Sequence, residues 1–384
     1  MPPARQIREP RWGEAPWKID FTPPAGPVPQ SVDVAVVGAG FTGLAAAAWL
    51  RHLAPDKSVA VFEASRTGAG ASGRTGGMAL AETAAGDIRG LGDVLAGLER
   101  VLGDLDIDCD LELPGAWEIG RSKGIQDSPI DWNDSGNLRV VKEVPGGTLD
   151  PGKLVSGLAS AAHGRGAVIL ENHPVTNVEW RGHSQSGKDG AVVEAGGAQC
   201  FAGQILFATN ALSLALTDLA GRAEPKLTLA IATEPLSKTQ LEATGLAGGN
   251  PFYTVDLPYL WGRLRRDGSV IFGAGLVDAN QSGELAGIDI ATGKARELFA
   301  SIERRIHNLH PALRETNFTH RWGGPILFRE NWRPVFARHP GGKNAIVLGA
   351  YAGHGVALSV YLGTWAAEAL LGRRSLPRWG SFTK

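Results

Sequence analysis

The chain has 384 residues, enough for two domains around a sizeable core, and 38 basic against 39 acidic residues give it a net charge of −1. This balance provides no basic field for nucleic acid or an anionic membrane, so neither is an expected partner. The two cysteines, Cys109 and Cys200, lie too far apart for a metal or redox motif, which suits a reducing compartment. Residues 1–20 lack the apolar core of a signal peptide, and no apolar stretch is long enough to span a bilayer. We therefore expect a cytoplasmic protein.

Three glycines with the spacing G-x-G-x-x-G follow an apolar run of strand length at 34–37 and precede a helix-forming run at 44–53. They are Gly38, Gly40 and Gly43. In a dinucleotide-binding unit the first glycine makes a tight turn, the second lets a pyrophosphate approach the backbone, and the third lets the helix pack on the strand. The helix N-terminus then offers unpaired N–H groups and a positive dipole end to the phosphates.

A carboxylate at the end of the next strand strengthens this interpretation. The apolar run 59–62 ends at Glu63, twenty residues after Gly43, where it can accept hydrogen bonds from a ribose. Because 52 of the 384 residues are glycine, the glycine spacing alone is weak evidence. An ordinary glycine turn is the alternative, but it leaves the position of Glu63 unexplained.

The remaining pattern predicts helices and strands in alternation. A glycine-rich link covers 66–78, and Asp150 with Pro151 is typical of a helix start. Expected helices cover 87–105, 151–162, 294–309 and 356–371. Expected strands cover 111–119, 168–170, 175–180, 191–195, 205–208, 227–233, 259–263, 269–273 and 345–348, with 182–190 as a hairpin loop.

This order predicts an α/β protein with a Rossmann-like dinucleotide-binding domain and a second, α+β substrate domain that contains a mixed or antiparallel sheet. The proline-rich residues 1–30, with Trp12 and Trp17, are expected to form an extended arm over the globular body. We expect a discontinuous dinucleotide-binding domain of residues 31–85, 150–222 and 325–384. The substrate domain is expected to take 86–149 and 223–324.

The chain resembles the D-amino acid oxidase superfamily of FAD-dependent amine and amino acid oxidases, and within it the γ-glutamylputrescine oxidase branch. Besides the unit that ends at Glu63, three blocks carry the resemblance. They are G-A-S-G-R-T-G-G at 70–77, where the branch has Asn in place of Thr75; W-G-G at 322–324 followed by Arg333-Pro334; and G-A-Y-A-G-H-G-V-A-L at 349–358. The four blocks in this order span nearly the whole chain from about residue 10.

The resemblance implies FAD as the cofactor and a set of residues around it. These are Gly38, Gly40, Phe41, Thr42, Gly43, Glu63, Ala64, Ser72, Gly73, Arg74, Gly76, Gly77, Met78, Val175, Thr209, Gly353, His354, Gly355, Val356 and Ala357. The small residues of 72–77 would let backbone press against a flat ring while Arg74 supplies charge, although a flexible linker has the same composition. Gly353–Gly355 would place a helix N-terminus at the N1/O2 side of the ring, although a plain turn with a capping His is the alternative. Val175 is equally well explained as a core residue.

Two departures from the relatives qualify the function. Family members with covalent FAD use a cysteine in the segment before the last strand, but 319–336 has none, so we expect non-covalent FAD. The α-amino acid oxidases carry a Gly-Leu-Arg-Pro motif whose arginine pairs with the substrate carboxylate. This chain has no arginine in register at 323–326, although Arg321 or Arg329 nearby could substitute. The departure favours an amine whose carboxylate is distant or missing.

We therefore expect FAD-dependent oxidation of an amine to an imine that is later hydrolysed, with hydride passing to flavin N5 and then to dioxygen or another acceptor. The expected pocket residues are His354, Tyr259, Trp322 and Tyr351, together with Tyr253 and Trp261, whose rings can contact an alkyl amine. Core packing is the alternative for each. The histidines show no metal spacing, so no metal is expected. Open alternatives are oxidation of glycine, N-methyl or D-amino acids, a NAD-dependent dehydrogenase, and a flavin subunit of an electron-transfer complex. The oligomeric state is not predicted.

Overall fold

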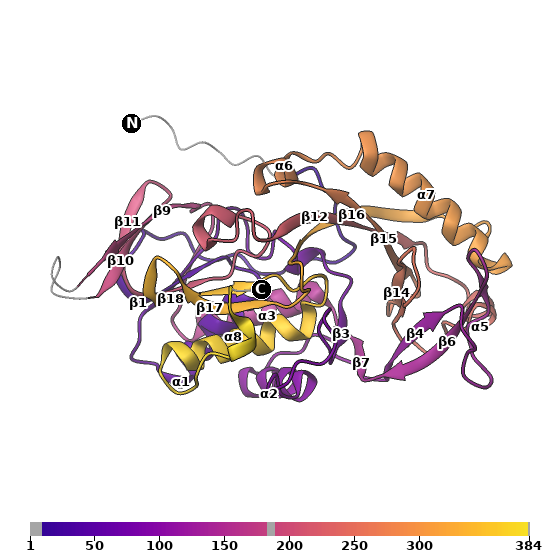
Figure 1. Cartoon of the computed structure of the whole chain (residues 1–384), viewed down its shortest axis with the longest axis horizontal. Coiled ribbons are helices and arrows are strands. Elements are labelled where there is room, and N and C mark those ends of the chain that lie inside the picture. Colours follow the sequence, from indigo (N-terminus) through magenta and orange to yellow (C-terminus); the bar gives the residue numbers. More distant parts are fainter. Residues whose placement is uncertain (1–9, 183–188, 383–384) are drawn as a thin grey trace.

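The computed structural model describes residues 10–182 and 189–382, which form two large β-sheets (Figure 1). Neighbouring strands of the first sheet from β18 to β8 are parallel, with β17 antiparallel at one edge. In spatial order the strands are β17 (Val335–His339), β18 (Gly342–Gly349), β11 (Ala198–Phe207), β1 (Ser31–Val37), β2 (Val59–Phe62) and β8 (Val168–Leu170), with β10 (Gly190–Ala195) and β9 (Val175–Arg181) extending from β11. Residues 183–188 of the expected hairpin loop lie outside the described residues.

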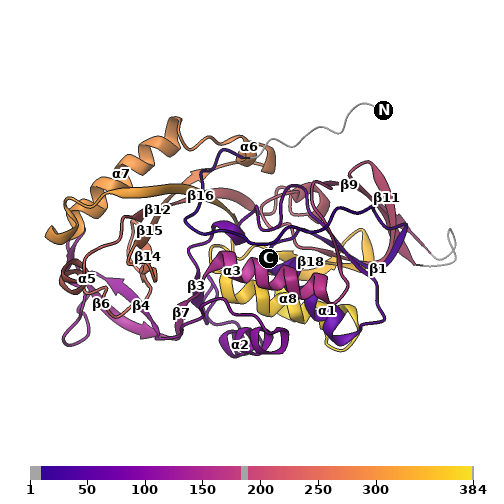
Figure 2. The same cartoon turned by 180° about the vertical axis from the view of Figure 1, so that it is seen from behind.

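One face of this sheet is covered by helices, which lie together in Figure 2. They are α1 (Phe41–Leu53), α3 (Pro151–Gly164), α8 (Val356–Leu370) and, packed outside α8, α2 (Val94–Leu105). Val34 and Val36 of β1 face this helical core, whereas Ala35 and Val37 face a second core on the other side. Because both faces of the strand are buried, it is apolar throughout, as parallel strands generally are.

The second sheet is mixed, as expected. Its strands in spatial order are β16 (Phe318–Phe328), β12 (Glu224–Thr233), β15 (Val270–Asp278), β14 (Trp261–Leu264), β13 (Phe252–Thr254), β4 (Ala116–Gly120), β6 (Asn137–Val144) and β5 (Trp132–Asn133). Only the β13–β4 pair is parallel among the pairs of these described strands. Helix α7 (Gly293–Leu309) runs along the outer face of this sheet (Figure 1). The α/β class with a Rossmann-like sheet and a second mixed sheet is thus confirmed.

Short elements complete the chain. They are the β3–β7 pair (Met78–Leu80 and Gly146–Thr148), α5 (Lys238–Thr244), α6 (Ser282–Gly287) and the 3₁₀ turns η1 (Ser72–Arg74), η2 (Leu214–Thr217), η3 (Pro311–Leu313) and η4 (Arg378–Gly380). Within the described residues, no helix is both long and apolar enough to cross a membrane.

The expected domain division stays a prediction, but two observations bear on its boundaries. Helix α2 falls in the range assigned to the substrate domain, yet it packs on α8 beneath the first sheet. The boundary after residue 324 falls inside β16. The described part of the expected arm, residues 10–30, is irregular. Trp12 in this arm is fully buried, and its carbonyl accepts the Gly323 N–H of β16 at 2.7 Å.

Several element boundaries differ from the sequence expectation for local reasons. Helix α2 begins at Val94 rather than near 87, because the Asp93 side chain accepts the Ala96 N–H at 3.0 Å and caps it. Helix α1 begins three residues early, and the expected strand at 259–263 starts only at Trp261. Strand β16 was not expected because Gly323–Pro325 interrupts its pattern; the proline is tolerated since β16 is an edge strand.

We expect Gly363→Ala in α8 to lower stability by about 1–3 kcal/mol, because the added Cβ would lie 2.6 Å from the Thr42 carbonyl oxygen of α1. Gly103→Ala in α2 is the matched control, since nothing lies within 4 Å of its Cβ and alanine favours the helix by up to about 1 kcal/mol. Thermal unfolding of FAD-saturated protein measures both. Equal melting temperatures for the two variants would contradict this packing.

Candidate functional site

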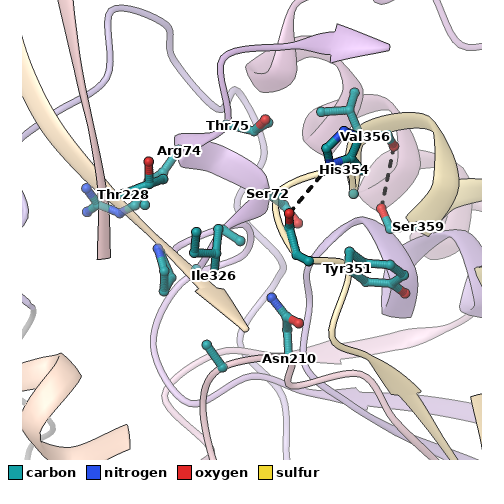
Figure 3. A pocket seen from close by; sticks show the side chains of 18 of the residues that line it. Ser72, Arg74, Thr75, Asn210, Thr228, Ile326, Tyr351, His354, Val356 and Ser359 are labelled. Atoms are coloured by element: carbon teal, nitrogen blue, oxygen red, sulfur yellow. Dashed lines mark hydrogen bonds between the residues drawn. The ribbon is translucent and has the colours of Figure 1, made fainter. Parts of the chain in front are cut away.

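A cavity of about 800 Å³ lies between the two sheets and takes residues from both. In Figure 3, Ser72, Arg74 and Thr75 come from η1 and its end, Thr228 and Ile326 from β12 and β16, and Tyr351 with His354 from the segment before α8. Segments distant in sequence therefore meet at one site.

The glycine loop has the geometry that the motif predicts. Gly38 has a φ of +107°, which side chains rarely adopt, and a Cβ at Gly43 would lie 2.0 Å from the Gly38 carbonyl oxygen. A Cβ at Gly40 would lie 2.8 Å from Ser72 Oγ, the atom that accepts the Phe41 N–H at 2.8 Å. The loop leaves backbone, rather than side chains, to face a ligand at the start of α1.

Glu63 lies at the end of β2 and is fixed by two backbone donors. Its carboxylate accepts the Ala39 N–H at 2.9 Å and the Ser65 N–H at 3.0 Å. Burial raises the pKa of Glu63, and these hydrogen bonds oppose the rise. The residue lines the same end of the cavity as Ala64 and Val175, so it both secures the glycine loop and can accept further hydrogen bonds there.

Thr209 supplies an independent sign that this cleft holds a polar ligand. Its Oγ1 is buried, lines the cavity and has no hydrogen-bond partner within the described chain. Buried polar atoms are nearly always satisfied, so a ligand atom is the expected partner. The next residue, Asn210, has a φ of +46° and accepts the Ala350 N–H at 2.9 Å, which ties β11 to the end of β18. The orphaned hydroxyl and the side-chain-free glycine loop fit the diphosphate and ribose parts of a dinucleotide.

The side chain of Arg74 differs from the expectation. We expected it to supply charge to a flat ring, but its guanidinium donates to the Gly13 carbonyl at 2.7 Å and the Ala69 carbonyl at 3.1 Å. It also lies 5.5 Å from the centre of the Trp12 ring. Much of its hydrogen-bonding capacity therefore anchors η1 to the segment that follows residue 10, although the residue still lines the cavity.

Aromatic rings hold the loop that contains η1 from two sides. The Trp261 ring lies so close to Gly76 that a Cβ there would be 2.1 Å away. Trp322 is fully buried, and its indole N–H donates to the Arg74 carbonyl at 2.9 Å. Trp17 meets Trp322 edge to face, with ring centres 5.7 Å apart. Trp322 thus positions the loop as well as lining the cavity.

The segment before α8 has an unusual backbone. Ala350 and Ala352 have φ values of +61° and +49°, which are rare for residues other than glycine, and Gly353 follows at +89°. Such strain persists where the surroundings fix it, most often at functional sites. Gly355 caps α8 without a side-chain hydrogen bond, so the helix N-terminus remains available to a negatively charged group.

His354 and Tyr351 have different roles in this segment. Burial lowers the pKa of His354 below its ordinary value of 6.5, so its ring is neutral at pH 7. Its Nδ1 lies 3.5 Å from the Ala352 carbonyl oxygen. The Tyr351 hydroxyl is 2.7 Å from Thr42 Oγ1, joining the starts of α8 and α1. Tyr351 therefore anchors the cavity wall through its hydroxyl, and it also lines the cavity.

Neither arginine suggested as a substitute for the missing Gly-Leu-Arg-Pro arginine reaches the cavity. Arg321 forms an ion pair with Glu303 of α7 at 2.6 Å, on the outer side of the second sheet. Arg329 donates to the Phe382 carbonyl at 3.3 Å. The suggestion that either one substitutes is wrong, and the uncharged residues Pro325 and Ile326 line this part of the wall.

Most of the expected site residues line the cavity, without their roles thereby being tested. Those that do are Gly38, Gly40, Phe41, Thr42, Glu63, Ala64, Ser72, Arg74, Gly76, Met78, Val175, Thr209, Tyr259, Trp322, Tyr351, Gly353, His354, Gly355 and Val356, with Tyr253 and Trp261. Gly43, Gly73, Gly77 and Ala357 do not, because they pack against protein backbone or core. Sequence reasoning missed Glu82, Asn210, Thr228 and Ile326. Only Asn210, placed after a buried strand and beside Thr209, carried a sequence signal.

Comparison with known proteins agrees with this geometry. The family described as FAD dependent oxidoreductase, DAO, matches residues 33–369. The γ-glutamylputrescine oxidoreductase of Escherichia coli strain K12 is 28% identical, over 88% of this chain and 84% of the relative. A probable oxidoreductase, OrdL, of Rhizobium meliloti strain 1021 is 26% identical, over 91% and 85%.

Solved structures share the fold at lower identity. Glycine oxidase from Geobacillus kaustophilus has a TM-score of 0.70 at 18% identity, covering 92% of this chain and 99% of its own. L-Proline dehydrogenase from P. horikoshii has a TM-score of 0.66 at 16% identity, covering 91% and 96%. The resemblance seen in the sequence is confirmed: the chain belongs to the DAO family of FAD-dependent oxidoreductases and is an enzyme with FAD as its cofactor.

Proposed function

We propose that this enzyme oxidises the C–N bond of an amine that has no carboxylate beside the reacting nitrogen. The observation that carries the proposal is the set of charged residues around the cavity. Within the described chain these are Glu63, Arg74 and Glu82, and the guanidinium of Arg74 bonds to backbone carbonyls. A substrate carboxylate would find Pro325 and Ile326 in this part of the wall and no arginine within the segment 323–326. Burying an unpaired carboxylate costs several kcal/mol, so such substrates would be disfavoured.

The similarity to a γ-glutamylputrescine oxidoreductase supports an amine of this kind, because that relative acts on a derivative of a diamine. The glycine oxidase and proline dehydrogenase structures share the fold at 18% and 16% identity and do not carry a substrate over. Oxidation of glycine, N-methyl or D-amino acids therefore remains the alternative that the substrate experiment must exclude.

The protein's contribution is to hold cofactor and substrate in a dry, oriented site. We propose that the glycine loop holds the diphosphate, Glu63 the ribose, and the segments 74–76 and 353–355 the two sides of the flavin ring. Bound FAD would accept hydride at N5 from the carbon beside the substrate nitrogen and pass electrons to dioxygen or another acceptor. Water would then hydrolyse the imine product.

Two features of the segment before α8 suit this chemistry. The N-terminus of α8 places a positive dipole end where negative charge would develop. His354 is neutral, so it adds a hydrogen-bonding group without adding a buried charge. We further propose that FAD is held without a covalent bond, because Cys109 and Cys200 are both buried and neither lines the cavity.

We expect Glu63→Ala to weaken FAD binding by about 1–3 kcal/mol, because the Ala39 N–H and the ribose both lose a partner. The fluorescence of FAD released on dilution measures the loss of affinity. Complete release of FAD by acid tests whether the cofactor is held without a covalent bond. Glu171→Ala is the matched control, since Glu171 follows the neighbouring strand β8 but does not line the cavity. Unchanged FAD retention in Glu63→Ala would restrict Glu63 to a structural part.

We expect His354→Ala to slow flavin reduction by about one to two orders of magnitude while FAD content stays complete, because a hydrogen-bonding group beside the reacting centre is lost. Since the pKa of His354 lies below 6.5, the ring is neutral throughout pH 7–9 and the ratio of wild-type to variant rates should be constant there. Anaerobic stopped-flow absorbance measures the rates. His320→Ala, a half-buried histidine on β16 that does not line the cavity, is the control. A wild-type rate in His354→Ala would refute this role.

The substrate class is tested by anaerobic flavin bleaching, which does not depend on the natural electron acceptor. We expect n-butylamine, 1,4-diaminobutane and its N-acetyl derivative to reduce the flavin with second-order rate constants about tenfold or more above those of glycine, sarcosine and D-alanine.

A gain-of-function variant sharpens the comparison. Ile326→Arg places a cation in the wall and should shift preference toward the carboxylate-bearing amines, whereas Ile326→Gln, of similar polarity but neutral, should not. If glycine, sarcosine or D-alanine is the best substrate of the wild type, the proposed function is wrong.

A further inference from the structure

Glu82 is a carboxylate of the cavity wall that the proposed reaction does not use. It lies two residues after β3, next to Thr83 and Ala84 in the lining. Its Oε1 accepts a hydrogen bond from the Tyr253 hydroxyl at 2.6 Å. Tyr253 is buried on β13, so the carboxylate is held from the side of the second sheet.

The charge of Glu82 has no ion-pair partner in the part of the chain that the structure describes. The Tyr253 oxygen is also 3.1 Å from Glu118 Oε1, but a phenol has one proton, and the shorter contact assigns it to Glu82. Glu118 has Lys142 at 3.7 Å, whereas no lysine, arginine or histidine forms an ion pair with Glu82 among residues 10–182 and 189–382. A carboxylate in this position is expected to bind a cation.

The position of Glu82 relative to the loop 72–77 follows from the pairing of β13 with β14. Trp261 of β14 presses on Gly76, and Tyr253 lies directly opposite Trp261 on the next strand. The Tyr253 hydroxyl in turn donates to the Glu82 carboxylate. The negative charge of Glu82 raises the pKa of His354 and so partly offsets the lowering caused by burial. Glu82 therefore lines the same cavity as the expected reaction centre. The Trp261 ring lies between Gly76 and strand β13, whose Tyr253 holds the Glu82 carboxylate.

On the basis of the proposed function, we propose that Glu82 binds a second nitrogen of the substrate, one that is positively charged and lies away from the carbon that is oxidised. The reacting nitrogen must be neutral so that its lone pair can form the C=N bond as the adjacent carbon releases hydride, and a carboxylate against it would stabilise the unreactive ammonium form. A distant ammonium group has no such conflict and gains a charge-assisted hydrogen bond. The aromatic rings of Tyr259 and Trp261 in the same wall suit the alkyl chain between the two nitrogens. The substrate class is therefore an alkyl diamine or a longer amine with a charged far end.

The test compares 1,4-diaminobutane with 4-amino-1-butanol, which keeps the chain and replaces the second ammonium with a neutral hydroxyl. Affinity is read from the change in FAD absorbance before reduction, and the rate of reduction is recorded in the same anaerobic experiment. We expect the wild type to bind the diamine about 10- to 100-fold more tightly than the amino alcohol, the range for a hydrogen bond to a charged group.

Matched variants assign this preference to Glu82. Glu82→Gln should bring the ratio of the two affinities close to one, whereas Glu118→Gln, which alters the carboxylate outside the cavity lining, should keep it within about threefold of the wild type. FAD content and thermal unfolding verify that Glu82→Gln is folded. If it is not, Tyr253→Phe, which removes the donor to Glu82 and preserves the ring, should reduce the ratio instead.

The outcomes separate this inference from the proposed function. Flavin reduction by both amines with equal affinity, or a preference that survives in Glu82→Gln, overturns the role of Glu82 and leaves amine oxidation standing. Diamine binding that depends on Glu82 but never reduces the flavin supports the cation site and overturns amine oxidation. Absence of detectable diamine binding to the wild type overturns the inference, whichever compound proves to be the substrate.

Discussion

The contact between α1 and α8 is the constraint on which the site depends. Gly363 lets α8 approach the Thr42 carbonyl, and the Tyr351 hydroxyl bonds to Thr42 Oγ1, so two helix N-termini some three hundred residues apart in sequence border one cavity. A side chain at residue 363 would push them apart. One terminus follows the glycine loop and the other follows His354, and both dipoles have their positive ends toward ligand space. The close helix packing therefore sets the electrostatics of the cleft as well as its shape.

The βαβ unit could be predicted from sequence because its determinants are local. Within one short segment Gly43 packs against the Gly38 carbonyl and Glu63 accepts the Ala39 N–H, and the close contact at Gly43 requires the residue that the motif names. The helix starting at Pro151 was predictable for the same reason, since the Asp150 side chain caps it through the Lys153 N–H. Strand β16 was not, because its glycines and Pro325 contradict strand propensity and only its edge position makes them acceptable.

Side-chain direction was the part of the site that sequence could not provide. Arg74 lies in a loop whose composition predicted contact with a ring, but its guanidinium turns to carbonyls of a segment sixty residues earlier. Glu82 carried no motif, and its importance appears only when β13 brings Tyr253 to it. Asn210 likewise depends on the arrival of Ala350 at the end of β18. Each of these contacts joins residues far apart in the chain, so their spacing in the sequence does not predict the contact.

The charges of the cavity explain how one fold can be directed to different amines. A guanidinium in the wall binds a carboxylate and selects amino acids, while an isolated carboxylate selects a second ammonium and rejects them. In this chain the segment 323–326 offers no guanidinium, and under the proposal above Glu82, which follows β3 and is bonded to Tyr253 of β13, supplies the carboxylate. Under the proposed function, substrate specificity would be set by the second sheet and the β3 loop, and cofactor binding by the glycine loop and the segment before α8.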